Sequence, residues 1–123
     1  MTENLIGKWA EAIKQHEGYF KGSRSYRNNN PANARFVGQK GAIGRDDKGF
    51  AVFATYSDGM KYLQAMLLNA ATGKSKIYKP TMTLYDFFAK YAPSSDGNKP
   101  RQYAESVAEQ MGVSPNDQIS SFV

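Results

Sequence analysis

The chain has 123 residues, of which 41% are hydrophobic and 22% charged, and its formal net charge is +5. This length and composition predict one globular domain over residues 1–123. The chain contains no cysteine and a single histidine, His16, which excludes a disulfide scaffold and a thiol nucleophile and argues against a zinc site. We therefore expect a site that needs no metal and no other cofactor.

The start of the chain does not resemble a secretion signal, because it carries acids at Glu3, Glu11 and Glu17 and lacks an apolar segment. No apolar run approaches the ~20 residues that a membrane span needs. We expect a protein without a membrane span that is made in the cytosol. If the protein acts outside the cytosol, something else must carry or release it.

The first predicted element is a helix over residues 4–17. Its stripe of residues at intervals of three and four consists of Leu5, Ile6, Trp9, Ile13 and His16. Asn4 or Thr2 is expected to cap its start, and Gly18 to follow its end. Residues 18–33, rich in Gly, Ser, Asn and Pro, predict an ordered loop.

A small antiparallel sheet is predicted next, from short β-type runs at residues 34–37, 42–45 and 50–54. The turn at residues 46–49 joins the last two runs into a hairpin.

Three further helices and a final turn follow. Ser57 is expected to cap a helix that ends at Gly73. Residues 83–86 resemble a capping box that opens a short helix, and Gly112 closes the next one. Pro115 is expected at the first helical position of a last turn. The predicted fold class is α+β, mostly α, with a small antiparallel sheet.

The positive charge lies in residues 21–40, here called the basic segment. It contains five bases and no acid, namely Lys21, Arg24, Arg27, Arg35 and Lys40. Such a segment attracts a polyanion, or it is an ordinary solvated loop without a partner. The chain has no RNP, zinc-finger or helix-turn-helix signature, so we do not expect nucleic acid to be a partner. The bacterial cell wall is the other polyanion.

Glu17 is the candidate for chemistry. It lies four residues after Ile13 and eight after Trp9, so it continues the apolar face of the first helix, whereas His16 points about 100° away. Burial and the negative end of the helix dipole both raise the pKa of a carboxyl group there, as a general acid requires. The alternative, which periodicity alone favours, is a structural glutamate bonded to the loop or to an arginine of the basic segment.

Two stretches flank this residue: residues 12–19 read AIKQHEGY and residues 27–36 read RNNNPANARF. Together they resemble the lysozyme-like superfamily, and more closely the phage and prophage peptidoglycan-cleaving proteins of the lytic transglycosylase type. The similarity continues through residues 44–45, 50–53, 57–59, 91–93 and 111–113 and through Tyr103, and so covers about residues 10–120. It departs at Ala32 and Ala34, where Gly and Leu are usual.

The resemblance implies a lysozyme-like fold with a cleft between the helices and the sheet. It implies that Glu17 protonates the glycosidic oxygen between N-acetylmuramic acid and N-acetylglucosamine. The residues that it places at the cleft as substrate-binding or bracing residues are Asn30, Pro31, Asn33, Arg35, Tyr91 and Tyr103. The implied partners are bacterial peptidoglycan and, in a phage particle, other virion proteins. The expected form is a monomer that acts in the virion or in the cell wall or periplasm of the host.

Aromatic side chains have two expected roles. Those expected in the core are Trp9, Phe53, Phe87 and Phe88. Those that could stack on sugar rings, besides Tyr91 and Tyr103, are Tyr19, Phe20, Tyr26 and Tyr56.

The sequence offers no convincing second carboxylate. Asp46 and Asp47 are typical of a turn, and Asp58 of a helix start. With a single acid, the resemblance implies a lytic transglycosylase, in which the 2-acetamido or 6-hydroxyl group of the substrate performs the displacement and leaves a 1,6-anhydro end. The alternatives are a hydrolytic lysozyme and a non-catalytic wall-binding or virion structural protein of the same fold.

Overall fold

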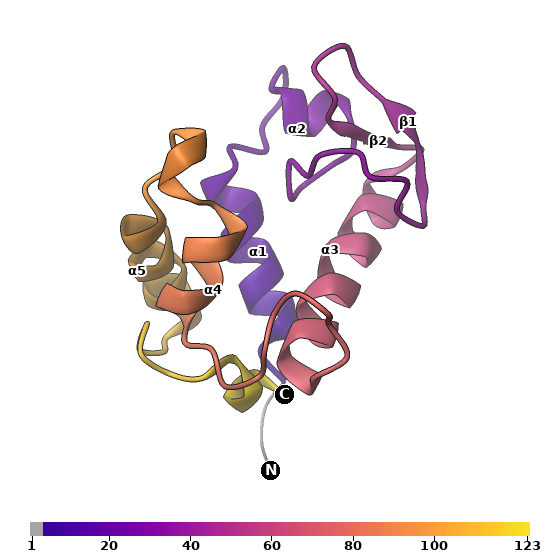
Figure 1. The fold of residues 1–123 in the computed structure, drawn as a ribbon. Helices are drawn as coiled ribbons and strands as arrows, with labels where there is room; N and C mark the ends of the chain where they lie inside the picture. Colours follow the sequence, from indigo (N-terminus) through magenta and orange to yellow (C-terminus); the bar gives the residue numbers. More distant parts are fainter. Residues whose placement is uncertain (1–3) are drawn as a thin grey trace.

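Five α-helices and one two-stranded antiparallel sheet are present in the computed structural model, which describes residues 4–123 (Figure 1). The elements are α1 (Ile6–His16), α2 (Arg24–Arg27), β1 (Ala42–Arg45), β2 (Ala51–Phe53), α3 (Tyr56–Thr72), α4 (Leu84–Tyr91) and α5 (Pro100–Met111), with 3₁₀ turns η1 (Ser94–Asp96) and η2 (Ile119–Phe122). The predicted class, α+β and mostly helical, is confirmed. Within residues 4–123, none of the helices combines the length and apolar character that a membrane crossing requires.

The helical core is built around Trp9 on α1. Its ring is fully buried and lies edge-on against Phe87 of α4 at 4.8 Å and Phe122 of η2 at 5.4 Å. The other aromatics expected inside, Phe53 and Phe88, are also buried. Burial of each such ring stabilises the fold by about 1.5–3 kcal/mol, so this cluster fixes α1 against α4.

The sheet and α2 lie together at the end of the molecule opposite its C-terminus, next to the start of α3 (Figure 1). Ala42 pairs with Phe53 and Arg45 with Ala51, with an irregular register between Ala42 and Gly44. The run at residues 34–37 does not form the expected third strand, because Arg35 makes only an isolated bridge to Phe50.

Several helix boundaries follow the predicted signals. Thr83 and Asp86 form the capping box of α4, and Gly73 and Gly112 end α3 and α5 in the left-handed conformation. Asn4 accepts a hydrogen bond from the backbone of Ile6 at 2.8 Å, but the N-cap position of α1 is occupied by Leu5 and not by Asn4. Thr2, the other expected cap, lies outside the described residues.

Two predicted helix starts are wrong. The cap of α3 is Thr55, not Ser57, because Thr55 has the extended backbone from which its hydroxyl accepts the Asp58 N–H at 3.1 Å. Pro115 begins no helix, because the Asp117 carboxylate accepts the Ser114 N–H and closes a turn there. The last turn begins instead at Ile119.

Candidate active site

A cleft of about 680 Å³ runs between the helices and the loop that leads into the sheet. It is lined by Glu17, Ala32, Asn33, Ala34, Arg35, Val37, Phe50, Tyr62, Tyr78, Tyr91, Ala92, Ser95, Asp96 and Asn98. These residues come from the end of α1, the loop before β1, the turn between β1 and β2, and α3. The segment between α3 and α4, the end of α4 and the segment after it supply the others. The cleft thus gathers segments that are distant in the sequence around the predicted acid.

Glu17 occupies the C-cap of α1, where the chain leaves the helix. Its backbone N–H donates to Ile13 O at 2.8 Å, and Gly18, with a φ of 70°, turns the chain away. Its side chain is half-buried and lies at the cleft. Glu17 continues the apolar face of α1, and its carboxyl group therefore lies at the wall of the cleft.

Two side chains hold the Glu17 carboxyl group. Tyr103 on α5 donates its hydroxyl hydrogen to Glu17 Oε2 at 2.7 Å, and the Asn33 side chain is a second hydrogen-bond partner. Burial raises the pKa of Glu17 above its ordinary value, and these two hydrogen bonds only partly oppose the rise. The site therefore favours a protonated carboxyl group at a higher pH than an exposed glutamate does.

Tyr103 is itself firmly placed. Its ring is 1% exposed and is stacked between His16, at a centroid distance of 3.6 Å, and Phe88, at 4.3 Å. Its burial raises the pKa of its hydroxyl far above the usual range, so the group remains a donor. The expectation that His16 serves packing agrees with this stacking, and Tyr103 acts as a positioning residue for Glu17.

Tyr103→Phe is expected to raise the pKa of Glu17 further, because the lost hydrogen bond stabilises the carboxylate. If Glu17 is a general acid, the alkaline limb of the pH–rate profile then moves to higher pH. The control is Tyr85→Phe, which removes a hydroxyl bonded to Glu105 on the surface. Identical pH profiles for both variants would contradict this role of Tyr103.

Asn33 sits in an unusual local geometry. Its φ is 49°, in the left-handed region, and its Oδ1 is buried without a hydrogen-bond partner among the described residues. Such strain and such an unpaired acceptor are unfavourable and are typical of functional positions. The backbone here directs the side chain of Asn33 toward Glu17.

Three of the six residues expected to bind substrate or to brace the cleft line it: Asn33, Arg35 and Tyr91. The Arg35 guanidinium lies 4.7 Å from the centroid of the Phe50 ring and donates to Lys48 O at 3.2 Å. The Tyr91 hydroxyl donates to Ala32 O at 3.3 Å, which links α4 to the loop across the cleft.

Asn30 and Tyr103 do not line the cleft. Asn30 is 0% exposed, and its amide donates to Ala34 O and Ala51 O while its Oδ1 accepts the Ala34 N–H. It braces the cleft wall from behind, as buried Pro31 does. Tyr103 is buried behind Glu17 and does not line the cleft.

The four aromatic residues proposed as further stacking positions, Tyr19, Phe20, Tyr26 and Tyr56, do not line the cleft either. Tyr19 packs against Tyr26 and Tyr56 at centroid distances of 5.3 Å and 5.4 Å. The Lys14 ammonium lies over the rings of Tyr19 and Tyr56, which gives this cluster a structural role.

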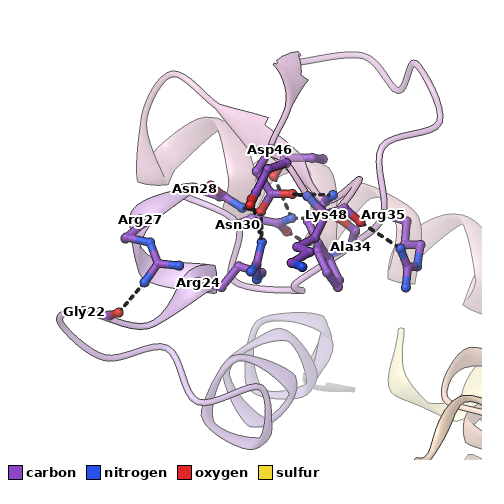
Figure 2. A network of polar contacts seen from close by, with 12 residues as sticks. Gly22, Arg24, Arg27, Asn28, Asn30, Ala34, Arg35, Asp46 and Lys48 are labelled. Atoms are coloured by element: carbon purple, nitrogen blue, oxygen red, sulfur yellow. Dashed lines mark hydrogen bonds and ion pairs between the residues drawn. The ribbon is translucent and has the colours of Figure 1, made fainter.

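The carboxylate of Asp46 is fully engaged by its surroundings (Figure 2). Its Oδ2 accepts from Arg24 and from Asn28, the latter at 2.9 Å, and its Oδ1 accepts the backbone N–H groups of Lys48 and Phe50, both at 2.9 Å. Partial desolvation acts to raise its pKa, but these hydrogen bonds outweigh it and hold the pKa well below the usual range. Asp46 therefore organises the hairpin and is not available as a nucleophile.

This network also changes the picture of the basic segment. Arg24 is paired with Asp46 and lies 3.6 Å from Asp47, and Arg27 donates to the backbone of Gly22. Acids from outside the segment thus neutralise part of its charge. Arg24 is a structural residue rather than a free cation.

Asp46→Asn is expected to destabilise the protein at neutral pH, because an amide nitrogen replaces one of the two accepting oxygens. Since the folded-state pKa lies below the ordinary 3.8, the stabilisation by Asp46 is present above that pH and is lost as the pH falls. The difference in melting temperature from the wild type should therefore shrink in acid. Asp47→Asn, at an exposed carboxylate, is the control and should melt like the wild type.

Asp96 is a cleft carboxylate that the sequence interpretation missed. It belongs to η1, lies on the cleft with Glu17 and is exposed. Asp47 and Asp58, the other acids considered, do not line this cleft. In the described part of the chain, no cluster of three or more His, Asp or Glu side chains could hold a metal ion.

The site is thus a half-buried glutamate with a raised pKa and two hydrogen-bond partners, in a cleft rich in tyrosine. No protein-family model matches the sequence, and comparisons with curated proteins and with solved structures return no match.

Proposed function

We propose that the protein is a peptidoglycan lytic transglycosylase with a lysozyme-like fold. It cleaves the β-1,4 bond between N-acetylmuramic acid and N-acetylglucosamine. The observation that carries the proposal is Glu17, whose pKa is raised by burial while its carboxyl group borders the cleft. Protonation of a glycosidic oxygen near neutral pH requires an acid of this kind.

The lining of the cleft supports a sugar substrate. Tyr62, Tyr78 and Tyr91 line it together with the amide side chains of Asn33 and Asn98. Tyrosine rings offer apolar faces to pyranose rings, and amides exchange hydrogen bonds with hydroxyl and acetamido groups. An uncharged, extended sugar chain is the ligand that this combination fits.

In the proposed reaction Glu17 gives its proton to the glycosidic oxygen as the bond from that oxygen to C1 of the muramyl residue breaks. The 6-hydroxyl oxygen of the same residue forms the new bond to C1, directly or after participation of the 2-acetamido group. Its proton passes to the Glu17 carboxylate, which regenerates the acid. Tyr103 and Asn33 stabilise the carboxylate between the two proton transfers.

A hydrolytic lysozyme is the second candidate, and Asp96 favours it. A carboxylate on the same cleft as the acid could hold and activate a water molecule. Asp96 is exposed and its side chain forms no hydrogen bond with residues 4–123, so it is held less firmly than the Glu17 carboxyl group, which is bonded by Tyr103. We therefore give the transglycosylase priority.

Digestion of purified peptidoglycan followed by mass spectrometry of the released muropeptides tests both candidates. The transglycosylase predicts 1,6-anhydro ends and little loss of activity in Asp96→Asn. Reducing ends, abolished by Asp96→Asn, would identify the hydrolase instead. If the wild type releases no muropeptides from walls that it binds, the fold serves wall binding without catalysis.

A further inference from the structure

A second pocket, of about 610 Å³, lies beside the cleft and is here called the side pocket. Residues 39–41 form part of its wall, and one face of α3 and Ser75 form the rest. Tyr62 of α3 lines both the side pocket and the Glu17 cleft, so the two hollows adjoin at this side chain. A ligand held in the cleft can therefore extend a branch past Tyr62.

Two lysines on the wall of the side pocket have no salt-bridge partner among the residues that the structure describes. They are Lys40 and Lys61. Asp58 is the opposing acid on the wall. Exposed Lys74 and Lys76 flank the lining residue Ser75 in the sequence and add to the positive field.

The rest of the wall suits an aliphatic peptide better than a sugar. Ala65, Met66 and the ring of Tyr62 form an apolar surface, and the Asn69 side chain is exposed at its edge. Carboxylates on short aliphatic side chains match free ammonium groups above such a surface. A neutral N-acetylhexosamine would leave both lysines unused.

We propose that the side pocket binds the anionic peptide attached to the lactyl group of the glycan strand, while the strand itself occupies the Glu17 cleft. This inference rests on the proposed function, because that function supplies a strand with peptide branches. Lys40 and Lys61 receive the peptide carboxylates, and Met66 and Tyr62 receive its aliphatic parts. The enzyme would then prefer strands that still carry their peptides.

Titration calorimetry with the inactive Glu17→Gln protein tests this preference. It measures the affinity for two glycan strands of equal length that differ only in their peptides. One strand carries its peptides, and the other is stripped by an amidase, which leaves the lactyl carboxylate in place. We expect the peptide-bearing strand to bind about 5–10-fold more tightly, as charge contacts with two exposed lysines allow. Lys40→Gln/Lys61→Gln should abolish most of this ratio, and added salt should reduce it.

The control Lys48→Gln/Lys90→Gln removes the same charge from lysines that line neither hollow, and should keep the ratio. Equal affinity for both strands would overturn the inference. A second result would also overturn it. If a longer stripped strand binds more tightly than a short one, and Lys40→Gln/Lys61→Gln abolishes this gain, then further sugars and not peptide fill the side pocket.

A free anionic tetrapeptide, added in an NMR titration, separates failure of this inference from failure of the proposed function. Amide shifts at Tyr62 and Met66 support the side pocket even if the wild type cleaves no strand, and their absence overturns it. Muropeptide release by the wild type reports on the proposed function alone.

Discussion

Glu17→Gln is expected to reduce muropeptide release by at least about 10²–10⁴-fold, to near background. Glutamine keeps the size of the side chain and can still accept from Tyr103, but it has no transferable proton. Within residues 4–123, no other acid on the cleft lining is held in place by side-chain hydrogen bonds, so no group there is positioned to replace it. Initial rates on purified peptidoglycan measure this loss.

The same variant should be at least as stable as the wild type at neutral pH. Because burial raises the folded-state pKa of Glu17 above the ordinary 4.5, the folded protein binds this proton more tightly than the unfolded chain. The wild type therefore loses stability as the pH rises from 4.5 through that pKa, and glutamine removes this loss. Thermal unfolding at pH 7 and at pH 4 measures the difference, which should vanish at the lower pH.

The control for both effects is Glu109→Gln, at an exposed position on α5 that does not line the cleft. It makes the same change of charge and should keep wild-type turnover. Wild-type turnover in Glu17→Gln would contradict the catalytic role. If Glu17→Gln is less stable than the wild type at pH 7, this would favour the alternative from the sequence analysis, in which Glu17 is a structural residue.

The elements with local signals were predictable from the sequence. The three- and four-residue spacing of apolar residues predicts α1, and the capping box of Thr83 and Asp86 predicts the start of α4. Gly73 predicts the end of α3. Each of these signals acts within one or two helical turns. The start of α3 was not predictable in this way. Thr55 and Ser57 are both good caps, and the extended path out of β2 decides between them.

The candidate acid was predictable, but its cleft was not. Glu17 continues an apolar face that is visible in the sequence. Tyr62, Tyr78 and Asp96 come from separate segments, and only tertiary packing brings them to the cleft. A local signal for the burial of Tyr103 did exist: it shares a helix face with Val107 and Met111, four and eight residues on.

Asn30 illustrates what sequence patterns do not contain. It lies in a run of three asparagines whose members have different roles: Asn28 and Asn30 are buried, whereas Asn29 is only partly buried. Asn29 donates to Phe53 O and Ala54 O, and Asn30 to Ala34 O and Ala51 O. These bonds join the loop to β2, and only the folded backbone shows which amide faces inward.

Gly59→Ala is expected to destabilise the protein by about 1–3 kcal/mol or more, although alanine favours a helix over glycine. Gly59 is buried in the first turns of α3, and an added Cβ would lie 1.9 Å from Asn29 O and 2.9 Å from the Pro31 side chain. Asn29 is held by its bonds to β2, so its backbone cannot withdraw without breaking them. The free energy of unfolding, from urea denaturation, measures the effect.

Gly7→Ala is the matched control, because Gly7 is an exposed glycine in α1 with nothing within 4 Å of an added Cβ. It should leave stability unchanged or raise it by up to about 1 kcal/mol.

Gly59→Ala should also impair cleavage, since the displaced segment leads from Asn29 through Pro31 to Asn33, whose side chain forms a hydrogen bond with Glu17. If both alanine variants are equally stable, α3 does not pack against this loop as closely as the structure shows, and the cleft wall behind Asn33 is not rigid.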